Sequence, residues 1–269
     1  MPYVKANGIK IYYEIHGPDD CSPLVLIEGI WQDSWMWFRQ IPDFNKKYRC
    51  IVFDNRGVGR TSKPDSPYSI QMMCDDVFGL LKALEIPKVH VLGVSFGGFI
   101  AQQFAISYPD SVISLILATT HFGGKNYIEM DKQSLALMVA SPTETISKEQ
   151  ALEMRLSVSH SEEFLKNNRK IIDQTLVWRE LHPPTDYSRL HQFRAALDVD
   201  LEKDLHKITC PTLIIQGTKD RLVPPKNAEL LAEKIPNSQT HFIEGGPHWI
   251  CIEYYEEFNK VILEFLDKQ

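Results

Sequence analysis

Short apolar runs alternate with segments of helical period along most of the chain. The first two runs, 3–5 and 9–15, flank Asn7-Gly8, a dipeptide suited to a tight hairpin turn. Continuous apolar runs are typical of strands that are buried on both faces, and strand–helix alternation indicates a mostly parallel sheet between helices. Six further strands are predicted at 24–27, 50–53, 89–92, 114–117, 212–215 and 240–243, and helices at 70–84, 96–107, 226–234 and 254–266.

The alternation stops after Thr119 and resumes at about Cys210. The segment between them has helical period, with a capping box that starts at Ser147 and a second helix start at Ser161. Residues 177–184 are predicted to break the helical run before a further helix at 187–197. We therefore expect an α/β core domain made of residues 1–120 and 207–269, with a helical cap, or lid, inserted at 121–206.

Composition and charge exclude some kinds of binding partner and some cellular locations. The formal net charge is −6 and no basic run occurs, which argues against binding to nucleic acid. No apolar stretch approaches the length that spans a membrane, and the N-terminal residues lack the pattern of a signal peptide. The five cysteines are scattered and form no CxxC pair, so we expect free thiols and a cytoplasmic protein, as a monomer or homodimer.

The clearest chemical motif is Gly93-Val-Ser95-Phe-Gly97, which matches G-x-S-x-G. It follows an apolar strand and precedes an amphipathic helix, the context in which a nucleophile sits on a sharp turn between small residues. The amide of Phe96 would then lie at the helix N-terminus, where it could bind an oxyanion. The alternative is a glycine-rich structural turn with an incidental serine.

A serine nucleophile requires a base and a group that orients the base. Asp220 and His248 each follow a predicted strand, which places both side chains at the carboxyl edge of the sheet together with Ser95. Of the other histidines, His90 is predicted in the core, and His121 could line a pocket, although a local role is the simpler expectation. A group of five is expected to be solvated or to make local contacts: His16, His160, His182, His206 and His241.

At these residues the chain resembles the α/β-hydrolase superfamily, whose triad follows the same order of Ser, Asp and His. The stretch 54–62 is similar to the D-x-R-G-x-G-x-S loop of that family, and 54–120 with 208–215 loosely resembles the 3-oxoadipate enol-lactonase-like esterases. The resemblance implies an α/β-hydrolase fold with a mostly parallel eight-stranded sheet, helices on both faces and the helical cap. It also implies that the backbone N–H of Ile30 is the second oxyanion donor.

One position departs from the family. The family usually carries His-Gly after the third strand, whereas this chain has Glu28-Gly29. An ionised, unpaired carboxylate there would oppose an oxyanion, but a partner or a raised pKa would remove the conflict. We expect Glu28 to hold the loop.

The predicted activity is acyl transfer from a small to medium carboxylic ester or lactone to water through Ser95, without a metal or organic cofactor. Aromatic residues near the oxyanion loop and in the cap predict an apolar pocket that suits a modest hydrophobic group. Two alternatives stay open: hydrolysis of a thioester or C–C bond with the same residues, and a binding protein with slow turnover. The pocket residues expected are Trp31, His121, Trp178, His191 and Trp249.

Overall fold

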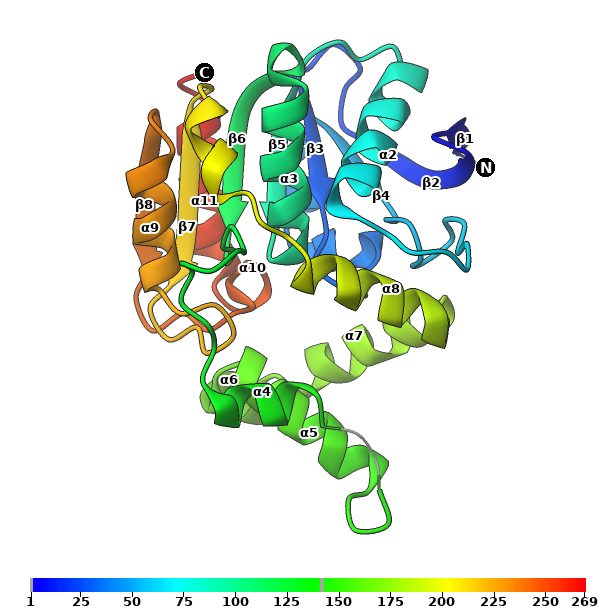
Figure 1. Cartoon of the computed structure of the whole chain (residues 1–269), viewed down its shortest axis with the longest axis vertical. Coiled ribbons are helices and arrows are strands. Elements are labelled where there is room, and N and C mark those ends of the chain that lie inside the picture. The colour runs from blue at the N-terminus through cyan, green and yellow to red at the C-terminus, as the bar shows by residue number, and fades with distance from the viewer. Residues whose placement is uncertain (1, 141–142) are drawn as a thin grey trace.

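A computed structural model describes residues 2–140 and 143–269. Eight strands form a single sheet in the order β1-β2-β4-β3-β5-β6-β7-β8, and every pairing from β4 to β8 is parallel (Figure 1). β2 runs antiparallel to both of its neighbours, β1 and β4. The strands are β1 (Tyr3–Ala6), β2 (Ile9–His16), β3 (Pro23–Ile27), β4 (Arg49–Phe53), β5 (Val89–Val94), β6 (Val112–Ala118), β7 (Thr212–Gly217) and β8 (Ser238–Ile243).

Side-chain alternation along the strands divides the core into two layers. In β3, Val25 and Ile27 pack on one side of the sheet, and Leu24 and Leu26 on the other. Helices cover both layers. The continuous apolar runs predict this arrangement, because a strand that is buried on both faces does not alternate polar and apolar residues. The eight-stranded, mostly parallel sheet with helices on both faces is therefore confirmed.

The first layer is covered by α2 (Ile70–Ala83), α3 (Phe96–Ser107) and α9 (Lys226–Lys234), and the second by η1 (Ser34–Arg39), α1 (Ile41–Phe44), α10 (Ile250–Glu253) and α11 (Tyr255–Leu266). A short turn of helix, η2 (Pro109–Ser111), precedes β6. The helix expected at 254–266 is confirmed as α11, which begins one residue later, and α10 is an additional short turn of helix before it.

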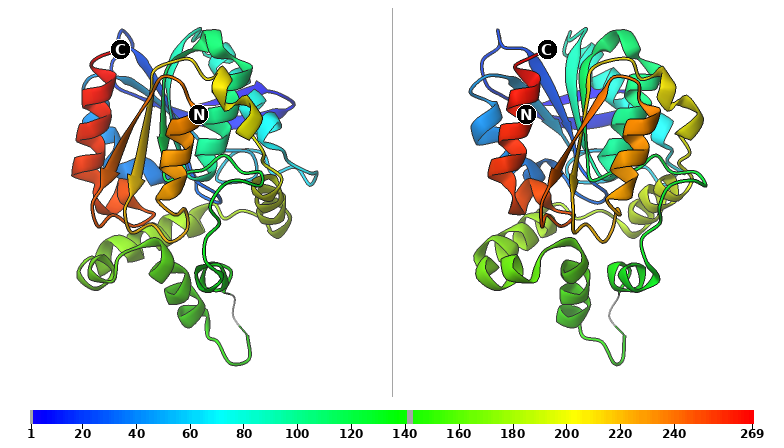
Figure 2. Two further views of the ribbon diagram at one scale, coloured as in Figure 1. Left: turned by 60° about the vertical axis from the view of Figure 1, so that its left-hand side comes forward. Right: turned by 90° about the vertical axis from the view of Figure 1, so that its left-hand side faces the viewer.

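Between β6 and β7 the described residues form five α-helices, which make a separate layer beyond one end of the sheet (Figures 1 and 2). They are α4 (Lys132–Met138), α5 (Lys148–Ser159), α6 (Glu162–Asn167), α7 (Arg169–Leu181) and α8 (Asp186–Leu197), and η3 (Glu202–Lys207) leads back to the core. The break expected at 177–184 is wrong in its first half, because α7 continues to Leu181. The two prolines, Pro183 and Pro184, follow its end.

None of the helices in the described ranges combines the length and the apolar character that crossing a bilayer requires.

Candidate active site

Ser95 occupies the turn between β5 and α3 in a strained backbone conformation. Its φ of 54° and ψ of −115° lie outside the regions that ordinary residues favour. Three hydrogen bonds hold this geometry: Ser95 N donates to Ala118 O at 2.9 Å, and Ser95 O accepts from Gly98 N and from Thr120 Oγ1, each at 2.8 Å. The turn therefore presents the Ser95 hydroxyl at the carboxyl end of the sheet.

Close backbone approach explains the small residues that flank this turn. A Cβ atom at Gly97 would come within 2.2 Å of Ile27 O, and one at Gly93 within 2.4 Å of Gly97 O. Ile27 O belongs to β3 and Gly97 O to α3, so a larger side chain at either glycine would push these elements apart and open the turn. The G-x-S-x-G pattern thus has a steric origin in this chain.

The structure brings His248 to the Ser95 hydroxyl across 153 residues of sequence. His248 Nε2 lies 3.1 Å from Ser95 Oγ, and His248 Nδ1 lies 2.8 Å from Asp220 Oδ2. Because a carboxylate only accepts, the imidazole proton belongs on Nδ1, and Nε2 is free to accept the serine proton. His248 and Asp220 are buried, so water does not compete strongly for these bonds.

Asp220 is held in place by its own loop after β7. Its Oδ1 accepts from the amides of Leu222 and Val223, each at 2.9 Å, and its Oδ2 accepts from Gln216 Nε2 at 2.9 Å. Both carboxylate oxygens of Asp220 therefore accept hydrogen bonds from this loop and β7, in addition to the bond between Oδ2 and His248. Such an acceptor fixes the ring orientation and stabilises an imidazolium.

The two expected oxyanion donors lie in the wall of the same cavity as Ser95. Ile30 and Phe96 line the same cavity as Ser95, and Gly29, next to Ile30, lies so close that a Cβ there would be 3.8 Å from Ser95 Cβ. Within 2–140 and 143–269, the amides of Ile30 and Phe96 have no hydrogen-bond partner. They are free to donate to an oxygen that develops negative charge.

Glu28 is fully buried behind this loop. Its Oε1 accepts from Asn55 N at 2.6 Å, while Oε2 has no partner in the described part of the chain. Burial, and next the charge of Asp54, raise the pKa of Glu28 well above its usual range, although the bond from Asn55 opposes the shift. Burial therefore opposes ionisation of Glu28, which weakens the charge conflict with the expected oxyanion site.

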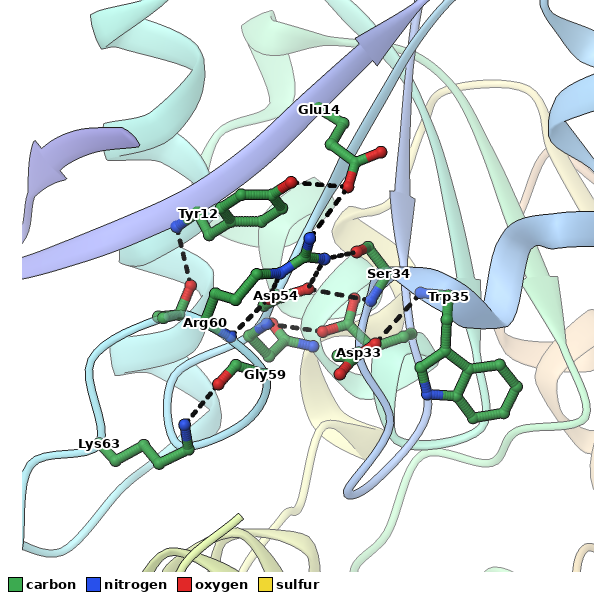
Figure 3. Close-up of polar contacts among 12 residues, drawn as sticks. Tyr12, Glu14, Asp33, Ser34, Trp35, Asp54, Gly59, Arg60 and Lys63 are labelled. Atoms are coloured by element: carbon green, nitrogen blue, oxygen red, sulfur yellow. Dashed lines mark hydrogen bonds and ion pairs between the residues drawn. The ribbon is translucent and has the colours of Figure 1, made fainter. Parts of the chain in front are cut away.

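A polar network anchors the segment that follows the Ile30 loop (Figure 3). Asp54 Oδ1 accepts from Ser34 N at 3.0 Å, and Asp54 Oδ2 accepts from Arg60 N at 2.7 Å and Arg60 Nε at 3.1 Å. Arg60 also donates to Ser34 Oγ at 2.7 Å. Asp33 caps η1 and, because of burial and the nearby Asp54, its pKa is raised to about 6. The loop resembling D-x-R-G-x-G-x-S is therefore structural here.

A cavity of about 480 Å³ lies between the core and the α4–α8 layer, with Ser95 and His248 in its wall. This volume is within the range of sites for small organic molecules. Its lining is mainly apolar and aromatic. The core and the α4–α8 layer both contribute residues to it, including Trp35, Phe99, Leu156, Phe193 and Val223. Of the expected pocket residues, Trp31, His121 and Trp249 are in this lining.

The ring of His121 is fixed as a neutral donor. Gly123 N donates to His121 Nδ1 at 3.0 Å, so the proton of the neutral ring is on Nε2. Tyr127 stacks on the ring with centroids 4.1 Å apart, and Phe99 packs against its edge. Burial, and then the nearby His248, lower the pKa of His121 to about 4. The ring stays uncharged at neutral pH.

Two expected pocket residues lie outside the lining, and their assignment is corrected. Trp178 packs on Trp35 and Phe38, with ring centroids 5.9 and 5.1 Å away. His191 Nε2 lies 3.0 Å from Asp65 Oδ1, on the far side of α8 from the cavity-lining Phe193. In both cases the helix turns a neighbouring residue towards the cavity, since successive side chains are about 100° apart.

The expectation that His160 is solvated or local is wrong. It is only 8% exposed, lines the cavity, and stacks on Phe164 with centroids 5.5 Å apart. Its ring also approaches Trp249 at 5.5 Å, and Glu253 lies 3.6 Å from its Nδ1. Burial lowers the pKa of His160 despite Glu253. By contrast, His90 is buried, and its place in the core is confirmed.

Sequence reasoning also missed two cavity-lining arginines, Arg155 and Arg179. A signal was present: each stands in a helical segment where the positions three and four residues away carry no acidic side chain. Surface arginines on helices are commonly paired at this spacing. For metals, the described residues contain no group of three or more His, Cys, Asp and Glu side chains that could hold an ion.

Comparison with known proteins agrees with this architecture. The family model for the alpha/beta hydrolase fold matches residues 22–255. A proline iminopeptidase of Pestalotiopsis fici is 31% identical over the whole of both chains. A poly(3-hydroxyalkanoate) depolymerase of Ectopseudomonas oleovorans is 30% identical over 94% of this chain and 87% of its own. The solved structure of a thermophilic esterase from Thermogutta terrifontis, 26% identical, superposes with a TM-score of 0.83 over 100% of this chain and 99% of that one.

Proposed function

The chain belongs to the α/β-hydrolase family, and we propose that it is a serine hydrolase acting on small to medium carboxylic esters or lactones. The observation that carries this proposal is the continuous path from Ser95 Oγ to His248 Nε2, and from His248 Nδ1 to Asp220 Oδ2, at 3.1 and 2.8 Å. The path opens into a mainly apolar cavity of about 480 Å³.

In this proposal Ser95 Oγ attacks the substrate carbonyl carbon while His248 Nε2 takes the hydroxyl proton. The carbonyl oxygen becomes an oxyanion that accepts hydrogen bonds from the Ile30 and Phe96 amides. The intermediate collapses, the alkoxide leaves, and His248 gives it the proton. Water then attacks the acyl-enzyme with His248 as base, which releases the acid and restores Ser95. Asp220 keeps the imidazole in the tautomer that both steps require.

Two features support hydrolysis over slow-turnover binding. The amides of Ile30 and Phe96 have no partner among the described residues, and the raised pKa of Glu28 weakens the charge conflict that its position in the loop had suggested. We also propose that residues 121–206 act as the lid of this site, since α5, α7 and α8 supply part of the cavity wall. The five free cysteines support the proposed cytoplasmic location.

Steady-state kinetics on a panel of substrates tests the proposal. The panel holds p-nitrophenyl butyrate, a γ-lactone, an acyl thioester and L-proline p-nitroanilide, the last because of the iminopeptidase relative. We expect turnover of the ester or lactone, and a loss in kcat of at least about 10⁴-fold in Ser95→Ala. Ser66→Ala, at an exposed loop position, is the matched control and keeps full activity. Ester turnover that survives in Ser95→Ala would exclude the proposed mechanism.

A further inference from the structure

Two arginines from the α4–α8 layer share the cavity with Ser95. Arg155 lies on α5 and Arg179 on α7, and both side chains are half-buried. Arg155 Nη1 donates to the backbone carbonyl of Ala140. The guanidinium of Arg179 makes no hydrogen bond or ion pair with any residue in 2–140 or 143–269. One guanidinium with no partner and one with a backbone partner thus face the same space.

Among the described residues, no carboxylate forms an ion pair with Arg155 or Arg179. Burial lowers the pKa of Arg179 to about 10, and the positive charges of Arg189 and Arg155 add to this shift. The carboxylates of Glu180 and Asp33 act in the opposite direction from a distance, without an ion pair to Arg179. Arg179 therefore stays charged at neutral pH. A desolvated cation without a counter-charge costs free energy, and a bound anion would recover it.

The orientation of α7 directs this charge into the cavity. Arg179 follows Thr175 by four residues and Ile172 by seven, and all three line the cavity, as one stripe of a helix does. The acidic residue of the lining, Glu129, is exposed to solvent. The remaining lining is largely apolar, so the cavity suits a molecule with an apolar body and an anionic group.

We propose that Arg155 and Arg179 bind a carboxylate carried by the substrate, so that the substrate is an ester or lactone with a free carboxylate away from the bond that Ser95 attacks. This inference rests on the proposed function and specifies its substrate class. Planar guanidinium groups match carboxylates with two parallel hydrogen bonds. A cationic substrate, such as a peptide with an N-terminal proline, would be repelled by the same pair.

Matched esters that differ in a single carboxylate test the proposal. The monoethyl esters of succinic, adipic and suberic acids are compared with the ethyl esters of butyric, hexanoic and octanoic acids at pH 8, where Arg179 is still protonated. For the chain length that fits best, kcat/KM is expected to favour the acid-bearing ester. In Arg179→Gln this preference falls by about tenfold or more, through KM, and Arg179→Lys retains part of it.

Arg169→Gln serves as the control, because Arg169 lies on the same helix but is exposed and paired with Glu153 and Asp173. It removes the same charge and should keep the preference. A wild-type enzyme that favours the neutral esters at every chain length would overturn the proposal. So would a preference that Arg179→Gln leaves unchanged.

A binding measurement separates this inference from the proposed function. Calorimetry on Ser95→Ala compares monoethyl adipate with ethyl hexanoate, with and without Arg179→Gln, and needs no turnover. Tighter binding of the adipate monoester that depends on Arg179 would support the carboxylate site even if no ester is hydrolysed. Equal binding of the two esters would contradict it even if Ser95 hydrolyses both.

Discussion

The protonation of Glu28 depends on its surroundings more than on its residue type. Its position next to Gly29 could be recognised in the sequence, but its protonation state could not. That state depends on complete burial and on the distance to Asp54, and both arise from tertiary packing. The same holds for His121, where a hydrogen bond from Gly123 fixes the tautomer and burial lowers the pKa.

The raised pKa of Glu28 gives a pH-dependent prediction. A folded pKa above the unfolded value of about 4.5 means that the native state holds the proton more tightly, so wild-type stability falls as pH rises above that value. Glu28→Gln does not titrate and keeps an acceptor for Asn55 N. Its free energy of unfolding, relative to wild type, should increase by up to about 1.4 kcal/mol per pH unit until the folded pKa is reached.

Urea denaturation from pH 4.5 to 8 measures this difference. Glu264→Gln, at an exposed position on α11, is the control and should show a much smaller dependence on pH. A constant offset between Glu28→Gln and wild type over this range would show that Glu28 is ionised in the folded protein.

At the scale of an element, helical phase decides which side chains reach the cavity. On α7, Arg179 lines the cavity whereas Trp178, one residue earlier, packs against Trp35. The sequence predicted helices in this region correctly, but periodicity over short amphipathic helices did not determine which face is turned inward. Trp178 was therefore expected to line the pocket, and Arg179 beside it was missed.

The two chain segments that connect the α4–α8 layer to the sheet pair with each other. Gly123 and Asp200 form an antiparallel bridge, Gly124 N donates to Val199 O at 2.9 Å, and Leu201 N donates to Phe122 O at 2.9 Å. This pairing was not expected from the sequence, since the contacts join residues about 80 apart. It places His121, just before the bridge, at the cavity.

Gly123→Ala should therefore be strongly destabilising. Gly123 has a φ of 72°, and a Cβ there would come within 2.0 Å of Val199 O. Gly8 is the matched control, because its φ is 76° and a Cβ there would meet nothing within 4 Å. Gly8→Ala therefore measures only the cost of a positive φ for alanine, about 1 kcal/mol. We expect Gly123→Ala to cost at least about 2 kcal/mol more than Gly8→Ala in urea denaturation. Equal losses would mean that the connection yields without strain.

For the molecule as a whole, the sequence contained most of the architecture. Buried parallel strands are recognisable because they are apolar throughout, and the order of Ser95, Asp220 and His248 after three strand ends placed them at one edge. The sheet order and the cavity volume were not predictable in this way, because they depend on which strands pair and on how the α4–α8 layer packs against the sheet. The charge inside the cavity likewise required coordinates.

The central claim is that Ser95 is a nucleophile made reactive by His248 and Asp220. Intact-protein mass spectrometry after brief exposure to a fluorophosphonate tests it most directly, with the adduct mapped by peptide sequencing. The account predicts one adduct on Ser95 in the wild-type protein, and its loss in both Ser95→Ala and His248→Ala. A folded wild-type protein that remains unlabelled, or that carries the adduct on another residue, would contradict it.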